Sequence, residues 1–201
     1  MTRLSYTKAL HSLLIPVGFT REKSMWSRVT GEILEQVDLQ KSWIDGAVTV
    51  NMWAENLETD RIVRTIPCKH VLGALPQIVR IGRIVDGPMS LDRWWKNNPD
   101  GPVEVASLVR DHGLPWFSKV TTLEDQALFW YGRGKLGTWN KGNLAALAVT
   151  LCRLGELDEA LAMFDEPIPR MAEPVMVEMA RCVQRWLEEQ KRQREASRAP
   201  V

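Results

Sequence analysis

Cys68, Lys69 and His70 form the short segment whose side chains are best suited to chemistry. A thiol beside an imidazole base could act as a nucleophile, and the same two groups could bind a metal ion. On an extended segment, residues two apart project to the same face, which would bring Cys68 and His70 together. No second Cys or His pair follows at metal-binding spacing, so a packed cysteine beside an ordinary surface histidine is the favoured alternative.

Signatures of common enzymes are absent from the sequence, among them H-E-x-x-H, G-x-S-x-G, the P-loop and the calcium loop. The segment Gly132–Gly137 matches G-x-G-x-x-G, but it follows an apolar helical pattern instead of a strand. A loop between helices therefore explains it better than a phosphate site does. We expect no cofactor and no metal, and an enzyme is less favoured than a binding protein.

A second candidate region combines tryptophan with positive charge. Arginine and tryptophan are typical anchors of protein interfaces, and the same side chains could stack on nucleobases. Adjacent tryptophans cannot both point into one core from a regular strand, so one of the pair could be exposed. Packing in the core is the first interpretation, protein contact the second and nucleic acid the third. The candidate residues are Arg80, Arg83, Arg93, Trp94, Trp95 and Lys96.

The net charge of the chain limits the kinds of partner that these residues could bind. In 201 residues, 26 Lys and Arg nearly balance 25 Asp and Glu, giving a net charge of +1. This balance argues against a protein that coats DNA through a basic face. Three widely spaced cysteines favour reduced thiols, and neither a signal peptide nor a membrane-spanning run is recognisable. We therefore expect a cytoplasmic protein without a membrane partner.

The first half of the chain alternates between apolar and polar residues as an antiparallel meander does. Thr30-Gly31 and Asp45-Gly46 separate the segments, and Asp-Gly is a strong hairpin signal. One face of such a sheet is apolar and needs a cover, which an amphipathic helix over Tyr6 to Ile15 would supply. The strands are expected at Met25 to Val29, Ile33 to Trp43 and Ala47 to Ala54, with a further strand near Val79 to Ile84.

The second half has helical periodicity. A helix opening at Asp100 is expected to close at Gly113, in the left-handed position, with Pro115 beyond. From Glu188 the pattern is wholly polar, which predicts a solvated tail. We therefore divide the chain into an α+β sheet domain at 1–120, a helical subdomain at 121–190 and a flexible tail at 191–201. Later helices are expected at Asn143 to Leu154, Leu157 to Asp165 and Pro174 to Leu187, the last docking on the preceding pair.

Several short segments together resemble a known family. VGF near the N-terminus, EQVDLQKS, VTVNMW, RIGRIVDG, DRWW and GLPWF look like the bacterial domain-of-unknown-function family numbered 4304, over about Tyr6 to Val120. The resemblance implies an α+β domain with a central antiparallel sheet, and it brings no catalytic residues. Separately, NLAALAVTLCRLGELDEALAMF is similar to one tetratricopeptide helix pair, and a single pair cannot make a solenoid.

The sequence thus predicts an α+β fold and a non-enzymatic protein-interaction module of a bacterial cytoplasm. An immunity protein that blocks a toxin domain is one such module, by analogy with other small α+β proteins. Two alternatives stay open: an enzyme using Cys68 and His70 or the Arg93–Trp95 region, and a nucleic-acid accessory factor.

Overall fold

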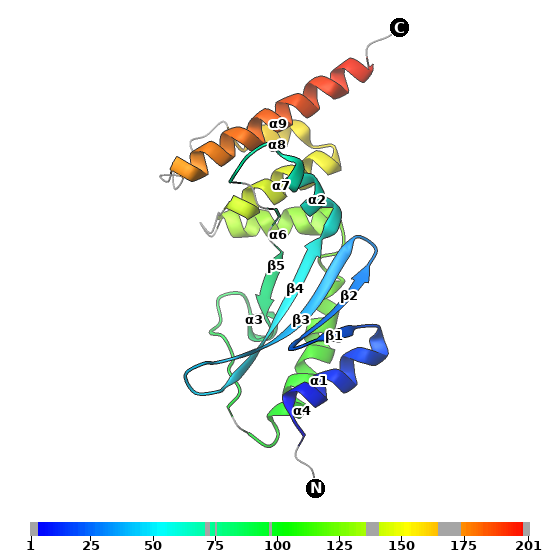
Figure 1. The fold of residues 1–201 in the computed structure, drawn as a ribbon, viewed down its shortest axis with the longest axis vertical. Coiled ribbons are helices and arrows are strands. Elements are labelled where there is room, and N and C mark those ends of the chain that lie inside the picture. The colour runs from blue at the N-terminus through cyan, green and yellow to red at the C-terminus, as the bar shows by residue number, and fades with distance from the viewer. Residues whose placement is uncertain are drawn as a thin grey trace. The chain divides into compact units, whose positions relative to one another are not determined.

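Antiparallel hairpins build the sheet of the computed structural model, which describes residues 4–70, 73, 74, 76–96, 98–135, 141–164 and 174–198 (Figure 1). Gly31 and Gly46 have positive φ angles, as the expected turns require. The predicted α+β class and antiparallel meander are confirmed. Five strands follow one another across the sheet in chain order: β1 (Thr20–Glu22), β2 (Met25–Thr30), β3 (Ile33–Lys41), β4 (Val48–Asn56) and β5 (Gln77–Arg80).

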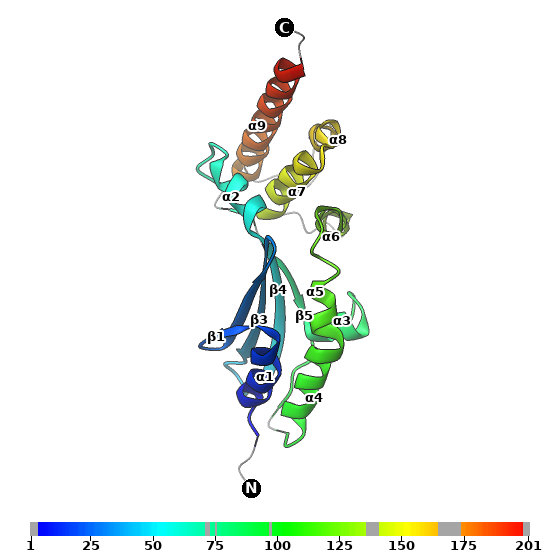
Figure 2. The same cartoon turned by 90° about the vertical axis from the view of Figure 1, so that its right-hand side faces the viewer.

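Helices cover one face of this sheet, with α4 and α5 along one side of it in the edge-on view of Figure 2. The expected first helix, α1 (Tyr6–Leu14), begins at Ser5, whose Oγ accepts the Lys8 amide at 3.2 Å. Behind the sheet lie α4 (Gly101–Leu108) and α5 (Leu114–Phe117). The core that they share with the strands includes Leu10, Leu14, Val37, Val50, Met52, Val105 and Phe117.

The helix that begins at Gly101 does not end at Gly113, so that prediction is wrong. It continues through a π-helical turn, Val109–Gly113, directly into α5. Gly113 has a right-handed φ of −69°, and a Cβ placed on it would lie 3.0 Å from Cε of Met52. Glycine therefore serves close packing at this position, and the sequence pattern of a left-handed cap is misleading.

The strand expected near Val79 to Ile84 is shorter and begins earlier. Strand β5 ends at Arg80, opposite Asn51 of β4, and the chain turns at once into α3 (Ile81–Asp86). Gly82 of α3 lies so close to the returning chain that a Cβ there would be 2.9 Å from the backbone nitrogen of Arg93. This close approach brings the segment after α3 back beside the sheet.

The chain divides into two units, and the second is assembled from two stretches that are far apart in sequence. The first unit comprises Met1–Asn56 and Pro76–Val120, and the second comprises Leu57–Leu75 and Thr121–Val201. The boundary expected near residue 120 coincides with one unit boundary, but residues 57–75 join the helical unit. Its helices are α2 (Leu57–Thr65), α6 (Leu123–Lys135), α7 (Lys141–Leu154), α8 (Leu157–Ala162) and α9 (Pro174–Arg198).

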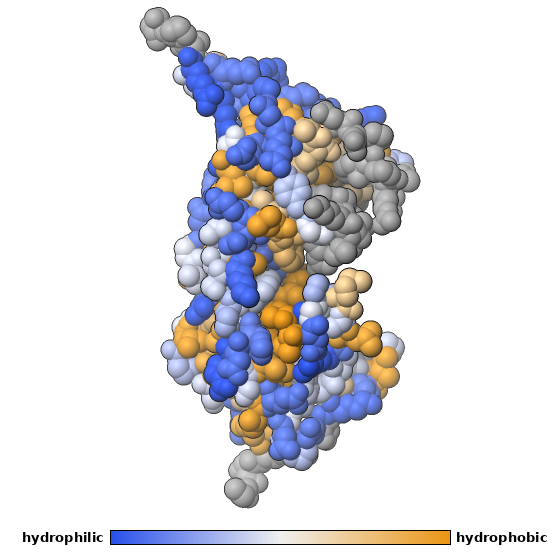
Figure 3. Space-filling model, turned by 180° about the vertical axis from the view of Figure 1, so that it is seen from behind, coloured by the Kyte–Doolittle hydropathy of each residue, from blue (hydrophilic) through white to orange (hydrophobic). Residues whose placement is uncertain are grey.

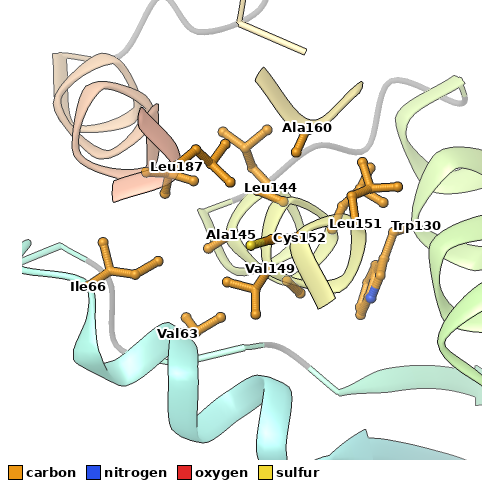
Figure 4. Packing of buried hydrophobic residues seen from close by; sticks show 14 of the residues in the cluster. Val63, Ile66, Trp130, Leu144, Ala145, Val149, Leu151, Cys152, Ala160 and Leu187 are labelled. Atoms are coloured by element: carbon orange, nitrogen blue, oxygen red, sulfur yellow. The ribbon is translucent and has the colours of Figure 1, made fainter. Parts of the chain in front are cut away.

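Helix α7 is the centre of the helical unit. Every residue from Asn143 to Cys152 is buried, as expected for a helix enclosed by others (Figure 4). Val63 of α2, Trp130 of α6, Ala160 of α8 and Leu187 of α9 belong to the same cluster. The expected pairing of α7 with α8 is confirmed, as is the docking of the α9 stripe. The buried α9 residues are Met176, Met179, Cys182, Val183 and Leu187.

The glycine-rich segment is partly helical. Helix α6 extends through Gly132 to Lys135, whereas a connection from Gly132 onward was expected. Residues 136–140 of that expected connection lie outside the described residues. The predicted helix from Leu157 ends at Ala162, and its last expected residue, Asp165, also lies outside them.

Helix α9 also extends into the segment expected to be a tail, because it runs to Arg198. Lys191 pairs with Asp158 of α8 at 2.7 Å, and Nη2 of Arg194 donates to the carbonyl of Cys152 at 2.7 Å. That carbonyl belongs to the last turn of α7, where a cation also complements the helix dipole. Charged side chains therefore attach the polar half of α9 to its neighbours.

We expect Arg194→Ala to lower the free energy of unfolding by about 1–2 kcal/mol, because it removes a charged hydrogen bond from the C-terminus of α7. Urea denaturation followed by circular dichroism would measure this loss. Arg192→Ala is the matched control, because the exposed Arg192 pairs only with half-exposed Glu189 in the described structure and its loss should stay below about 0.5 kcal/mol. Equal effects of the two substitutions would contradict the assignment.

Candidate functional site

The tryptophan segment is attached to the edge of β4 by a backbone bridge. The amide of Trp95 donates to the carbonyl of Val48, and the amide of Val48 donates to the carbonyl of Trp95, both at 2.8 Å. The bridge is antiparallel, so Trp95 and Val48 project to the same face of the sheet. Val48 lies in the core beneath the helices, and this places Trp95 there also.

The two tryptophans therefore have opposite environments. Trp95 is 7% exposed within the core of the first unit, whereas Trp94 is 38% exposed. The guanidinium carbon of Arg80 lies 5.3 Å from the ring centroid of Trp94, which is a cation–π contact. The possibility that one tryptophan of the pair is exposed is confirmed, and the exposed one is Trp94.

The basic residues of this region are paired with carboxylates of the same chain. Arg80 and Arg83 both bind Asp92, the latter through Nε at 2.9 Å. Arg93 binds Asp86 through two nitrogens, with Nε at 2.6 Å from Oδ2. These pairs fix the segment after α3 against β5 and α3. They also leave little unbalanced positive charge for an outside phosphate.

Lys96 provides a further link, between the tryptophan segment and the turn that joins β3 to β4. Its Nζ lies 3.6 Å from Oδ2 of Asp45. Hydrogen bonds from Ser42 and from the Ala47 amide, together with Lys96, lower the pKa of Asp45 below its ordinary value. Asp45 is therefore charged at neutral pH and faces Lys96 from the turn between β3 and β4, which can be followed in Figure 1.

Apolar side chains are exposed on both of these linked segments. Trp43 and Ile44, in the turn, are 93% and 77% exposed, and Met89 and Leu91 are 83% and 90% exposed. We call these four residues together with Trp94 the loop surface. Trp43 was expected at the end of a strand, but β3 ends at Lys41. The Asp45-Gly46 turn signal could have located Trp43 at an unpacked tip.

Isolated apolar groups at a protein surface are common and need no functional explanation. Figure 3 shows such groups in separate places between hydrophilic side chains on one face of the molecule. The loop surface differs because a tryptophan is almost fully exposed on a turn whose backbone is closed. The Ser42 amide donates to the Ala47 carbonyl at 2.7 Å across that turn.

Cys68 and His70 are not arranged as a nucleophile and its base. In the part of the chain that the structure describes, they form no hydrogen bond with each other. Nε2 of His70 instead lies 3.0 Å from Oε2 of Glu178 on α9. Cys68 packs against the core of the helical unit. The two groups that the sequence pattern suggested as partners therefore have other neighbours in the described part of the chain.

The thiol of Cys68 meets a second thiol instead. It lies near enough to Cys182 of α9 to interact with it electrostatically, and Nη2 of Arg185 lies 3.5 Å from Sγ of Cys182. Burial is the main cause that raises the pKa of Cys182, the contact with Cys68 adds to it, and Arg185 opposes it. The sequence gives no signal for this pair, since 114 positions separate the two cysteines.

A partly buried charge pair lies on the covered face of the sheet. Glu35 is 2% exposed and accepts from Nε of Arg28, its cross-strand partner, at 2.7 Å. Arg28 also donates to the carbonyl of Val17 at 2.7 Å, and its guanidinium lies 4.6 Å from the ring centroid of Phe19. These contacts occupy both charged groups, so we assign the pair a structural role.

Within the described residues, no group of three or more His, Cys, Asp or Glu side chains could hold a metal ion. None of the helices in the same part of the chain has the length and apolar character needed to cross a bilayer.

Comparisons with protein-family models, with curated proteins and with solved structures return no match to this chain. The resemblance to the family numbered 4304 therefore stays a prediction.

We expect Trp95→Ala to cost about 3–5 kcal/mol of unfolding free energy, because it empties a large site in the core. Trp94→Ala should cost about 1 kcal/mol or less, since it removes a half-exposed ring and one cation–π contact. Urea denaturation of the two variants side by side measures the difference. Severe unfolding by both substitutions would show that Trp94 is a core residue as well.

Proposed function

We propose that this chain is a non-enzymatic protein-binding module whose contact site is the loop surface. The observation that carries the proposal is the exposure of Trp43 and Ile44 on a closed turn that Asp45 ties to Lys96. Exposed aromatic and aliphatic side chains on a fixed backbone bind with little loss of conformational freedom. Tryptophan is also among the residues that contribute most to protein interfaces.

The charge arrangement supports a protein partner over a nucleic acid. A nucleic-acid surface needs cations free to neutralise phosphates. Here Arg80, Arg83 and Arg93 bind carboxylates of their own chain, and Lys96 faces Asp45. The basic residues that the sequence suggested as contacts thus form ion pairs within the chain, and these pairs hold the segments that carry the exposed apolar side chains.

The arrangement of Cys68 and His70 favours binding over catalysis in the same way. His70 is engaged by Glu178, and Cys68 contacts Cys182, so the two do not share a proton. In the other region considered for catalysis, Arg93–Trp95, the guanidinium of Arg93 is already paired with Asp86 and the ring of Trp95 is buried. A toxin domain as the partner, and with it an immunity role, stays a prediction from the sequence.

Capture from the native cell with matched variants tests this proposal. We expect the double variant Trp43→Ser/Ile44→Ser to lose the partner that the wild-type chain retains, without a change in thermal midpoint. With the purified partner, Trp43→Ala should weaken binding by about 2 kcal/mol or more, which is about thirtyfold in Kd. Isothermal titration calorimetry would measure the difference.

Two controls make the result specific to the loop surface. Leu128→Ser alters a side chain of α6 that is 70% exposed, and Cys68→Ser/His70→Ala removes the catalytic candidates. Both should retain the partner. The proposal fails if the Trp43→Ser/Ile44→Ser variant retains the partner as the wild type does, or if only the Cys68→Ser/His70→Ala variant loses it. Retention of single-stranded oligonucleotides that depends on Trp43 would favour the nucleic-acid alternative.

A further inference from the structure

We propose that Cys68 and Cys182 form an oxidisable dithiol, a site at which a small disulfide such as oxidised glutathione converts two free thiols into an intrachain disulfide. This inference concerns the helical unit and is independent of the proposed binding function. The structure holds all three cysteines as free thiols, so the dithiol is described in its reduced state.

The first support is the contact between the two thiols. Cys182 lies on α9 and is 5% exposed, whereas Cys68 lies in the turn after α2 and is partly exposed. Cys182 belongs to the hydrophobic cluster of the helical unit, Cys68 packs against the same cluster, and the two thiols interact electrostatically. An outside reagent can reach Cys68, and Cys182 is positioned to react with it next.

The second support is a clamp that holds the Cys68 turn on α9. His70 binds Oε2 of Glu178 at 3.0 Å, and Nζ of Lys69 lies 3.8 Å from Oε1 of the same carboxylate. Glu178 precedes Cys182 by one helical turn, so the clamp and the thiol lie on neighbouring parts of one helix face. The proximity of the thiols therefore also rests on the contacts of the two residues that follow Cys68.

The backbone at Cys68 also suits the bond that must form. A disulfide requires the two sulfurs to approach to about 2.05 Å with a defined torsion. Cys182 is fixed in α9, but residues 66–70 belong to no helix or strand. The Cys68 amide donates to the Ile66 carbonyl at 2.7 Å in this tight turn. Small changes in the turn can bring Cys68 to Cys182 without breaking a helix.

The reaction proceeds by two thiol–disulfide exchanges. Cys68 loses its proton and attacks one sulfur of the small disulfide, which releases one small thiol carrying that proton and leaves a mixed disulfide on Cys68. Cys182 then loses its proton and attacks Sγ of Cys68, which releases the second small thiol. Two protein thiols are oxidised, and one small disulfide is reduced to two thiols. Arg185, 3.5 Å from Cys182, favours the thiolate needed for the second step.

Cys152 provides an internal comparison. Its thiol is buried in α7, where burial raises its pKa and Arg194 partly opposes that shift. Among the described residues its sulfur has Arg194 as its hydrogen-bond partner, and it is not bonded to another thiol. Oxidation should therefore be specific to the other two cysteines.

The experiment is oxidation of the purified full chain with oxidised glutathione, followed by alkylation of free thiols and mass spectrometry. We expect the wild type and Cys152→Ser to lose two alkylation sites and to give a peptide linking Cys68 to Cys182. Dithiothreitol should restore both thiols. Cys182→Ala should instead accumulate glutathione on Cys68, and Cys68→Ser should give no linked peptide. Arg185→Gln should slow the closing step but not the first addition.

Three results would overturn the proposal. One is a wild-type chain that keeps glutathione on Cys68 without closing to Cys182. Another is a chain whose thiols all remain alkylatable after oxidation. The third is a linked peptide that contains Cys152. Because the wild-type chain alone distinguishes these results, a variant that failed to fold would not prevent the test. Circular dichroism of each variant identifies such a failure.

Discussion

The backbone bridge between Val48 and Trp95 is the interaction on which the candidate site depends. Strand β5 pairs with β4 only as far as Asn51, and the bridge occupies the same edge of β4 beyond that point. Alternation along an extended segment then directs Trp95 into the core and Trp94 to the opposite face. The buried ring is the anchor that makes the exposed one possible. Without the bridge, the segment after α3 would have neither a register nor a fixed distance from the turn at Trp43.

Charge pairing within the chain determines what the rest of that surface can contact. An arginine that already binds a carboxylate bidentately, as Arg93 binds Asp86, gains little from a second anion. Arg80 connects the ion pairs with the exposed ring, because it binds Asp92 and its guanidinium lies over Trp94. In the region where the sequence concentrates positive charge, the arginines are thus paired with carboxylates of their own chain. What remains for a partner is the apolar set on the loop surface.

Local patterns predicted those elements whose boundaries are set by local chemistry. The turns at Gly31 and Gly46 and the start of α9 at Pro174 follow from residues that restrict the backbone. Gly113 misled because its role depends on Met52, 61 positions earlier, which no local rule can reveal. The alternation rule allowed one exposed tryptophan but could not say which, since the register of Trp95 is set by Val48. Trp43 was missed because its exposure depends on where β3 ends.

In the helical unit, too, local sequence patterns could not predict contacts between distant parts of the chain. Helix α7 is mostly apolar and is buried from Asn143 to Cys152, so its stability depends on α2, α6, α8 and α9, which enclose it. One of these, α2, comes from a stretch between two strands, so the sequence gives no reason to place it with the last third of the chain. That packing brings the turn after α2 onto α9. The contact between Cys68 and Cys182 is thus a consequence of enclosing α7, which is why it joins positions that local sequence analysis treats as unrelated.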